Sequence, residues 1–396
     1  MRKLVVLFLV IAVGGIAVAL PAHFWITDRL AVLRTFYLLQ APLAKWNMRC
    51  SANAPLWLPR LAEHTIDRQF SLANQLAYMA PDGTLHHCET GWQGDMLRSP
   101  ELGVGTRFRY ASLSKLLTAD AVLARIDTGR LSLDTRLLDV LPELRPVAGM
   151  GIENITIAHL LRHRAGMDRL RRPDPMTMHG ARPWCPGELS HISRLRLDFA
   201  PGERQAYSNL GNCLHGVVLE RLEGRPFRDI METDYGLAAR GMAYIDGPYL
   251  ADEVRYDFRN SSFYGEDYYR HFDFPALSSS AGLSGNASAL ARLLHEVLHR
   301  RPLNIVSAPA DAACDPKGRD KCFGYAASLY RPSGTDLTLH VQGGLLFGAA
   351  SKAVIDSRGG ITVWLGSGMS QKPGEQSEEF ITELSAMLSQ HYDKQS

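Results

Sequence analysis

The chain has 396 residues, of which 46% are hydrophobic and 21% are charged, and its formal net charge at pH 7 is +2. This length can bury one large core or two, and the composition is that of an ordinary globular protein, which excludes wholesale disorder. The small net charge gives no reason to expect nucleic acid as a partner, since the basic cluster of Arg169, Arg171 and Arg172 is short and interrupted.

Residues 1–26 predict export of the chain. Two basic residues, Arg2 and Lys3, precede a long run without any charge. Cleavage after Ala19 would make this segment a signal peptide. Left uncleaved, the run is long enough to span a bilayer as an anchor, with Trp25 at the interface, and a buried core helix is a third interpretation. Export places the rest of the chain on the periplasmic side, either free in the periplasm or associated with the inner membrane through this segment.

The cysteines agree with export, because an oxidising compartment lets thiols pair. Several pairings are open, and we favour pairs of neighbours in the sequence: Cys50 with Cys88, Cys185 with Cys213, and Cys314 with Cys322. A Cys-x-x-Cys pattern does not occur in the sequence, which argues against a metal role for these residues.

Residues 27–69 predict a connecting segment with helical pieces. Pro42, Pro55 and Pro59 argue against one continuous helix, so we expect a spacer followed by a helix that leads into the main domain. That domain is expected to span residues 70–396.

Two strand patterns open the domain. Residues 75–80 and 84–90 flank Pro81-Asp82-Gly83, and Asp-Gly is a typical hairpin turn. Mostly helical patterns follow at 116–126, 131–144, 156–163 and 214–223. Further strands are expected at 337–340, 350–355 and 360–365, with helices at 286–300 and 375–391. We therefore expect a helical subdomain, about residues 118–280, between two halves of a sheet.

Ser112 stands where a polar, strand-like run gives way to an apolar helical pattern. Lys115 follows three residues later, so the hydroxyl and the amine can share one helix face. A serine beside an amine is an activated nucleophile. The unpaired N–H groups and the positive dipole end of a helix N-terminus would also stabilise an oxyanion that forms there.

A second candidate motif lies in the run 200–211, Ala-Pro-Gly-Glu-Arg-Gln-Ala-Tyr-Ser-Asn-Leu-Gly. Tyr207 and Asn209 are two residues apart in a predicted tight turn. They could offer a phenolic base and an amide to the same pocket.

Taken together, Ser-x-x-Lys at 112–115, Tyr-Ser-Asn at 207–209 and Gln-Gly-Gly at 342–344 resemble the serine β-lactamase and penicillin-binding protein superfamily. The tyrosine motif is similar to that of the branch with class C β-lactamases, D-Ala-D-Ala carboxypeptidases and family VIII esterases. The runs 127–131, 155–166 and 281–284 fit this branch too, and the resemblance covers about residues 75–391.

The resemblance implies an α/β fold, an α+β sandwich in which an antiparallel sheet is flanked by helices and carries the inserted helical subdomain. It implies that Ser112 is the nucleophile, Lys115 its amine partner and Tyr207 the general acid and base. Asn209 matches the amide that positions substrate and the lysine. Three further residues match the strand that forms the bottom of the pocket in this family: Gln342, Gly343 and Gly344. The oxyanion hole would consist of the backbone N–H groups of Ser112 and Leu345.

One position departs from the family pattern. The third motif begins with lysine in β-lactamases and carboxypeptidases and often with histidine in esterases, whereas here it begins with Gln342. A cation at this position helps to bind the carboxylate of β-lactam and D-Ala-D-Ala substrates. Losing that charge-assisted contact costs a few kcal/mol, on the order of 2, so Gln342 argues against efficient turnover of these substrates. His340 lies two residues upstream on the same strand face, but we do not assign it to the motif.

We therefore expect an exported serine hydrolase that cleaves an ester or amide of a small molecule or peptide through an acyl-serine, without a cofactor. Two alternatives remain open. One is a β-lactamase or D-Ala-D-Ala carboxypeptidase, and the other is a catalytically silent binding or scaffold relative, which the Gln342 departure favours.

Three other patterns have competing interpretations. His295-Glu296-x-x-His299 matches the zinc protease helix, but a third ligand at a matching distance does not follow it in the sequence. His159 and His163 also lie four apart on a helix, and we favour core or capping roles for them. The aromatic segment 249–274 predicts ordinary packing or, alternatively, a pocket wall.

Overall fold

A computed structural model describes residues 14–15, 19, 22–147, 149–171, 182–261, 265, 267–309, 322–346, 348–368 and 372–394 of the chain. Within these ranges, no helix combines the length and the apolar character needed to cross a membrane.

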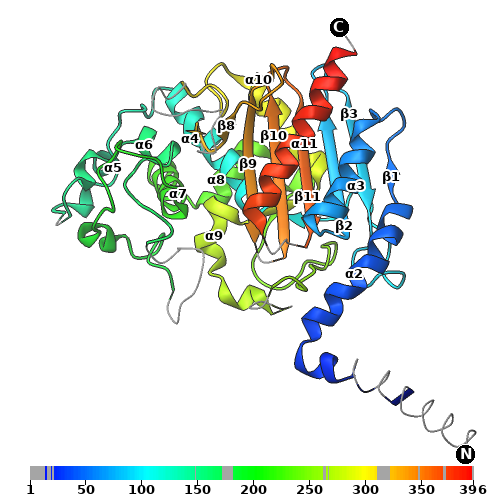
Figure 1. Cartoon of the computed structure of the whole chain (residues 1–396). Helices are drawn as coiled ribbons and strands as arrows, with labels where there is room; N and C mark the ends of the chain where they lie inside the picture. The colour runs from blue at the N-terminus through cyan, green and yellow to red at the C-terminus, as the bar shows by residue number, and fades with distance from the viewer. Residues whose placement is uncertain are drawn as a thin grey trace, which may run out of the picture.

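One eight-stranded sheet forms the centre of the fold, in the order β1-β3-β2-β11-β10-β9-β8-β7 (Figure 1). Every pair of neighbouring strands in it is antiparallel. The strands are β1 (Arg49–Cys50), β2 (Ala73–Met79), β3 (Leu85–Thr90), β7 (Cys322–Phe323), β8 (Ser328–Tyr330), β9 (Leu339–Leu346), β10 (Ala349–Asp356) and β11 (Ile361–Ser367). Because β2 pairs with β11, the predicted first hairpin and the C-terminal strands belong to the same sheet.

Helices cover both faces of the sheet. On one face, α3 (Trp57–Gln69) packs against α11 (Pro373–Asp393), and their apolar side chains form a core with Tyr78 and Trp364 (Figure 1). On the other face, α10 (Ala287–Arg300) packs on β2 and β11. This arrangement confirms the expected antiparallel sheet flanked by helices.

The mostly helical part of the chain lies to one side of the sheet, next to β8 and β9 (Figure 1). Its helices are α4 (Ser114–Asp127), α5 (Leu137–Val140), α6 (Ile157–Leu161), α7 (Asn209–Glu223), α8 (Phe227–Tyr235) and α9 (Phe274–Ala281). A small second sheet joins β4 (Phe108–Arg109), β6 (Leu283–Gly285) and β5 (Ala243–Tyr244). It connects the start of α4 to the segment that follows α9.

Two predicted segments differ from the structure. The helical pattern at 131–144 gives only the short α5 and a turn at Pro142–Leu144. Arg136 is extended and pairs with Thr156, so the helix begins only after it, and Pro142 follows its end. The predicted spacer after residue 27 is instead α2 (Arg29–Trp46), an 18-residue helix that contains Pro42. Helical structure is therefore interrupted at 47–56, between α2 and α3, rather than at this proline.

The disulfides agree with pairing of neighbours. Cys50 and Cys88 are bonded and lie opposite each other in the β1–β3 pair. Cys185 is bonded to Cys213 and fastens its loop to α7. Cys322 lies in β7, and its predicted partner Cys314 lies outside the described residues.

In the described part of the aromatic segment 249–274, the side chains pack around a buried ion pair. The Arg109 guanidinium contacts the Glu253 carboxylate at 2.5 Å, and both side chains are fully buried. The Arg109 guanidinium also lies 5.0 Å from the centre of the Tyr268 ring and 5.7 Å from that of Tyr249. These contacts support the packing interpretation rather than a substrate-pocket wall.

Candidate active site

Ser112 lies in a tight turn between β4 and α4. The turn, Ala111–Leu113, precedes the first residue of α4, so Ser112 stands at the helix N-terminus as predicted. Ala111 has φ of 49°, which costs a residue with a Cβ about 1 kcal/mol. Two hydroxyls hold this backbone: Ser351 Oγ donates to the Tyr110 carbonyl and Ser114 Oγ to that of Ala111, both at 2.8 Å. The turn therefore fixes the direction of the Ser112 side chain.

Lys115 is completely buried on the first turn of α4. Its Nζ lies 3.0 Å from Ser112 Oγ and donates to the Ser280 carbonyl at 2.7 Å. Because Ser280 belongs to α9, the amine is held between two helices. A carbonyl acceptor helps hold the ammonium in place and fixes its distance from the serine.

Tyr207 reaches the same serine from the loop before α7. Its hydroxyl lies 2.9 Å from Ser112 Oγ, and the Lys115 ammonium lies 5.2 Å from the centre of its ring. Ser208 caps α7, and its Oγ accepts a hydrogen bond from the N–H of Gly211 at 3.1 Å. The helix cap therefore sets where the tyrosine enters the site.

The surrounding charges favour the phenolate of Tyr207. Burial alone raises the pKa of this phenol, but the positive charge of Lys115 and the hydrogen bonds with Ser112 and Lys115 lower it, with Arg169 adding to the effect. Together they hold the pKa of Tyr207 below its usual value of 10.0. A phenolate next to a serine hydroxyl can act as a base.

His163 supports Tyr207 from behind. The two rings pack with their centres 4.6 Å apart, and His163 Nδ1 accepts a hydrogen bond from the N–H of Ser208 at 3.2 Å. Burial, together with the charge of Lys115, lowers the pKa of His163 to about 3. The imidazole is therefore neutral, as a packing role requires. His159 forms a capping box with Thr156, so both histidines have the core or capping roles that we favoured.

Asn209 is the first residue of α7 and is buried. Its backbone carbonyl accepts a hydrogen bond from Ser280 Oγ at 3.2 Å, while the Ser280 carbonyl accepts from Lys115. Asn209 and Lys115 are thus linked through one residue of α9. The role of its side chain toward substrate stays a prediction.

The strand β9 brings the third motif to the serine turn. Gln342 is buried, and its amide Nε2 donates to the backbone carbonyl of Ser112 at 3.2 Å and to that of Gly343 at 3.1 Å. Any Cβ at Gly344 would lie 2.8 Å from the Tyr110 carbonyl oxygen. Only glycine therefore lets β9 approach the turn this closely.

Beyond Val341, this edge of β9 extends past its pairing with β8, which covers Leu339–Val341. Leu345 lies on the extension and is partly exposed. An N–H on an unpaired strand edge can bind an oxyanion. The contribution of Leu345 to the oxyanion hole remains a prediction.

Arg169 is the residue that the sequence analysis did not place in the site. Its guanidinium lies 5.0 Å from the centre of the Tyr207 ring, and its backbone N–H donates to the Tyr207 carbonyl at 3.3 Å. The side chain is exposed. A basic cluster marked the position in the sequence, but that pattern usually indicates a solvated surface, so it did not point to the tyrosine.

The structure gives other roles to the zinc-like motif. Glu296 forms a two-point ion pair with Arg240, at 2.7 and 2.8 Å, and the rings of His295 and His299 lie 4.3 Å apart on α10. Among the described residues, no group of three or more His, Cys, Asp and Glu side chains could hold a metal ion.

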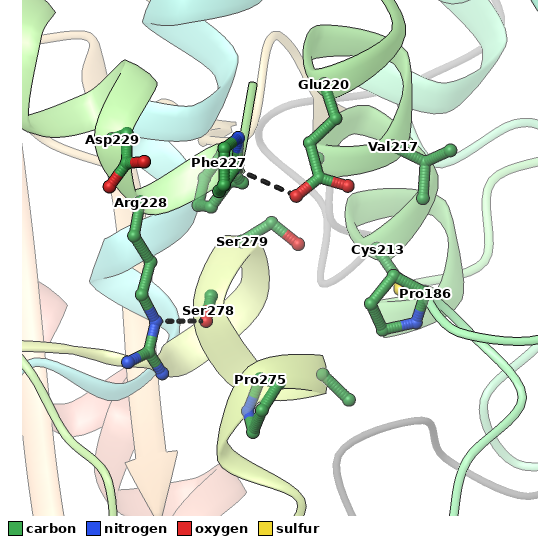
Figure 2. Close-up of a pocket in the computed structure, with 13 residues that line it drawn as sticks. Pro186, Cys213, Val217, Glu220, Phe227, Arg228, Asp229, Pro275, Ser278 and Ser279 are labelled. Atoms are coloured by element: carbon green, nitrogen blue, oxygen red, sulfur yellow. Dashed lines mark hydrogen bonds between the residues drawn. The ribbon is translucent and has the colours of Figure 1, made fainter. Parts of the chain in front are cut away.

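The helical part of the chain also has a cavity of about 350 Å³, which does not include the site. It lies between α7, α8 and α9, and Figure 2 shows Glu220, Arg228 and Ser278 among its lining residues. Ser112, Lys115 and Tyr207 are not part of its lining. Arg228 there donates to Ser278 Oγ at 2.9 Å, and Glu220 accepts from the N–H of Phe227 at 2.8 Å. Arg228 and Glu220 therefore each have a hydrogen-bond partner within the lining.

Comparison with known proteins agrees with this geometry. The model of the Beta-lactamase family matches residues 79–379, which include all three motifs. The chain belongs to this family. Its resemblance to serine β-lactamases and penicillin-binding proteins is therefore confirmed.

The chain is similar to individual proteins with different names. The chain is 38% identical over 360 residues to a putative fimbrial assembly protein FimD, serogroup D, of Dichelobacter nodosus, covering 91% of each chain. It is 31% identical over 199 residues to esterase EstB of Burkholderia gladioli, covering 47% of this chain and 49% of the esterase. Among solved structures, a D-amino acid amidase from Ochrobactrum anthropi has a TM-score of 0.65 at 18% identity, covering 82% of this chain and 96% of the amidase. The last similarity supports the fold alone.

Proposed function

We propose that this β-lactamase-family protein is a serine hydrolase that cleaves an ester or amide through an acyl-Ser112 intermediate. The observation that carries the proposal is the placement of two candidate bases on one hydroxyl. Lys115 Nζ lies 3.0 Å and the Tyr207 hydroxyl 2.9 Å from Ser112 Oγ. Both distances suit proton transfer.

The first chemical step is acylation. The Tyr207 phenolate or the neutral Lys115 amine takes the Ser112 proton as Oγ forms a bond to the substrate carbonyl carbon. The carbonyl oxygen becomes an oxyanion, which N–H groups at the start of α4 and on β9 can stabilise. When the bond to the leaving group breaks, the protonated base returns its proton to that group.

Deacylation reverses these roles. A water molecule loses a proton to the same base and attacks the acyl carbon, and Ser112 leaves with that proton. The lowered pKa of Tyr207 supports the phenol as the base because it raises the phenolate fraction near neutral pH. Lys115 would then act chiefly through its charge.

The walls of the site favour a neutral ester or amide as substrate. Gln342 supplies an amide where a cation stands in β-lactamases, and that amide already bonds to the Ser112 and Gly343 carbonyls. The named relatives of this chain include an esterase. We propose that the substrate is a small molecule or peptide and that residues 27–396 act on the periplasmic side of the membrane.

A catalytically silent relative is the second candidate. The name of the FimD relative, which matches 91% of the chain, supports a role in fimbrial assembly. In that role the same pocket would bind a peptide or partner without cleaving it. The two candidates differ in whether Ser112 becomes acylated.

The test is mass spectrometry of the purified protein after exposure to a fluorophosphonate and, separately, to a penicillin. Labelling of Ser112 by the phosphonate, without a stable penicilloyl adduct or penicillin hydrolysis, would support an esterase-like site. A penicilloyl-Ser112 adduct would overturn the substrate argument. Ser112→Ala provides the control, and folded protein that neither reagent labels would favour the silent relative.

A further inference from the structure

The helix α2 carries an unusual apolar surface on its outer side. Its inner side packs Tyr37, Ala41 and Ala44 against Ile66 of α3. The outer side exposes five large apolar residues, each between 37% and 79% exposed: Phe36, Leu38, Leu39, Leu43 and Trp46. We call these five residues the α2 stripe.

Helical spacing gathers most of the stripe on one line. Phe36, Leu39, Leu43 and Trp46 recur at intervals of three and four residues, which places them on one face of the helix. A helix on the surface of a soluble protein normally has polar side chains on its outer face. A contiguous exposed apolar face marks a contact with a membrane or a partner.

The stripe continues toward the N-terminus. Phe24, Trp25 and Ile26, just before α2, are also exposed, and the sequence carries no charge from position 4 to position 26. In Figure 1, α2 leads from the side of the folded domain toward the N-terminus and away from the sheet. The most apolar part of the sequence and the stripe therefore adjoin along the chain.

Charges beside the stripe are mostly positive. Arg29, Arg34 and Lys45 lie on α2. Lys45 forms an ion pair with Asp67 at 2.6 Å, Arg34 Nε donates to the Arg259 carbonyl at 2.9 Å, and the nearby Asp28 caps the helix by accepting from the N–H of Ala31. A cavity of about 310 Å³ next to α2 is lined by seven residues, of which three are cationic and none is acidic: Arg34, Tyr37, Phe70, Arg259, Asn260, Lys372 and Gln376. Two of these cations have acidic partners outside the lining: Arg259 pairs with Asp257, and Lys372 pairs with Glu375.

We propose that α2 lies in the interface of a bilayer that contains anionic phospholipids. The stripe faces the acyl chains, and Arg29 and Arg34 lie among the headgroup phosphates. Aromatic residues suit this depth, and Phe36 and Trp46 are both in the stripe. Cations at the edge of an apolar face add electrostatic attraction to anionic lipid. The docking holds the catalytic domain at the membrane surface and does not depend on the chemistry at Ser112.

The test measures quenching of Trp46 fluorescence by lipid. The full-length chain is reconstituted into phosphatidylethanolamine and phosphatidylglycerol vesicles, with or without bromine atoms on the upper acyl chain. The emission of Trp46 is obtained by subtracting the spectrum of Trp46→Phe from that of the unchanged chain. A parallel subtraction with Trp57→Phe gives the control, because Trp57 is buried against Tyr78 with ring centres 4.8 Å apart.

We expect bromine to remove more than about half of the Trp46 emission and to leave the Trp57 emission unchanged. The double variant Leu39→Asp with Leu43→Asp should restore the Trp46 emission while the Trp57 emission still reports a folded domain. Equal Trp46 emission with and without bromine would overturn the proposal. That result, combined with a cross-link between two copies through α2, would instead assign the stripe to self-association.

A lipid-charge series tests the electrostatic part. Replacing phosphatidylglycerol with phosphatidylcholine should weaken the quenching of Trp46, and so should raising the salt concentration. Quenching that is independent of lipid charge would overturn the assignment of Arg29 and Arg34 to headgroup phosphates.

Discussion

The two sides of the candidate site differ in how far they follow the β-lactamase family pattern. On the helical side, Ser112, Lys115 and Tyr207 match the motifs and meet within 3.0 Å of Ser112 Oγ. On the strand side, Gln342 replaces a cation and turns its amide to the backbone of the serine turn. The helical side therefore has the groups that we propose to carry out the reaction, whereas the strand side lacks the cation that stands at this position in β-lactamases.

Removal of the amine should have the largest effect on the helical side. Lys115→Met keeps most of the apolar stem but removes the charge that lowers the pKa of Tyr207. We expect kcat to fall by about a thousandfold, and the rise of activity with pH to move to higher pH. The measurement is kcat against pH for an activated ester, with circular dichroism as a folding control. Activity within tenfold of the unchanged chain, a margin of about 1.4 kcal/mol in the barrier, would show that Lys115 is not part of the catalytic machinery.

The strand side can be tested by returning a cation to it. Gln342→Lys should increase the rate of penicilloylation of Ser112 by about tenfold, because one charge-assisted contact contributes roughly 1.4 kcal/mol or more. Gln342→Met is the matched control, of similar length but without charge or donor. The rates come from intact-mass kinetics with a penicillin. If Lys and Met at this position gave equal rates, substrate choice would not depend on this cation.

Buried imidazoles behind the helical side predict how stability depends on pH. Burial lowers the pKa of His215 to about 3, and neither ring nitrogen has a hydrogen-bond partner among the described residues. Below an unfolded-state pKa of about 6.5, the unfolded chain binds a proton that the folded chain excludes, so stability falls as the pH falls. For each such histidine, the free energy of unfolding falls by about 1.4 kcal/mol per pH unit until the pH approaches the folded-state pKa.

His215→Leu should therefore reduce the loss of stability between pH 7.5 and pH 5 by about 2 kcal/mol. At pH 7.5 we expect little change, because an unpaired polar ring gives way to an apolar group. Urea unfolding at both pH values measures the effect, and His191→Leu, at an exposed position, is the control. An unchanged pH dependence would mean that His215 is charged or solvated in the folded chain. His163 should cause a similar loss of stability at low pH in the unchanged chain and in His215→Leu.

The smallest effect is expected at Arg169. Its charge helps to lower the pKa of Tyr207, but the side chain is exposed, so solvent screens the interaction. Arg169→Gln should lower kcat/KM at pH 7 by about threefold and shift the rising part of the pH profile to higher pH. Arg171→Gln, in the same loop, should leave the profile unchanged. Identical profiles for both variants would remove Arg169 from the site.

The sequence predicted the helices and strands whose hydrophobic residues are regularly spaced, and it predicted the site residues that belong to a motif. The antiparallel strands near the C-terminus, the helix at 286–300 and the Cys50–Cys88 and Cys185–Cys213 pairs were all correct. Sequence motifs also placed Ser112, Lys115 and Tyr207 together, because their order along the chain reflects a known arrangement in space.

The rest depended on tertiary contacts that no local pattern encodes. Arg169 joins the site because its loop folds over Tyr207, and only the three-dimensional structure shows that contact. The helix α2 forms despite Pro42 because Tyr37, Ala41 and Ala44 pack against α3. The hydrogen bond from the Gln342 amide to the Ser112 carbonyl also depends on how closely β9 approaches the serine turn.

The most direct test of the account is detection of the acyl-enzyme itself. The purified protein is mixed with a 4-nitrophenyl ester, the reaction is quenched with acid, and peptide mass spectrometry locates the acyl group. The account predicts a burst of nitrophenol and an acyl group on Ser112, both absent from Ser112→Ala. Turnover that persists in Ser112→Ala, or an acyl group on another residue, would contradict it.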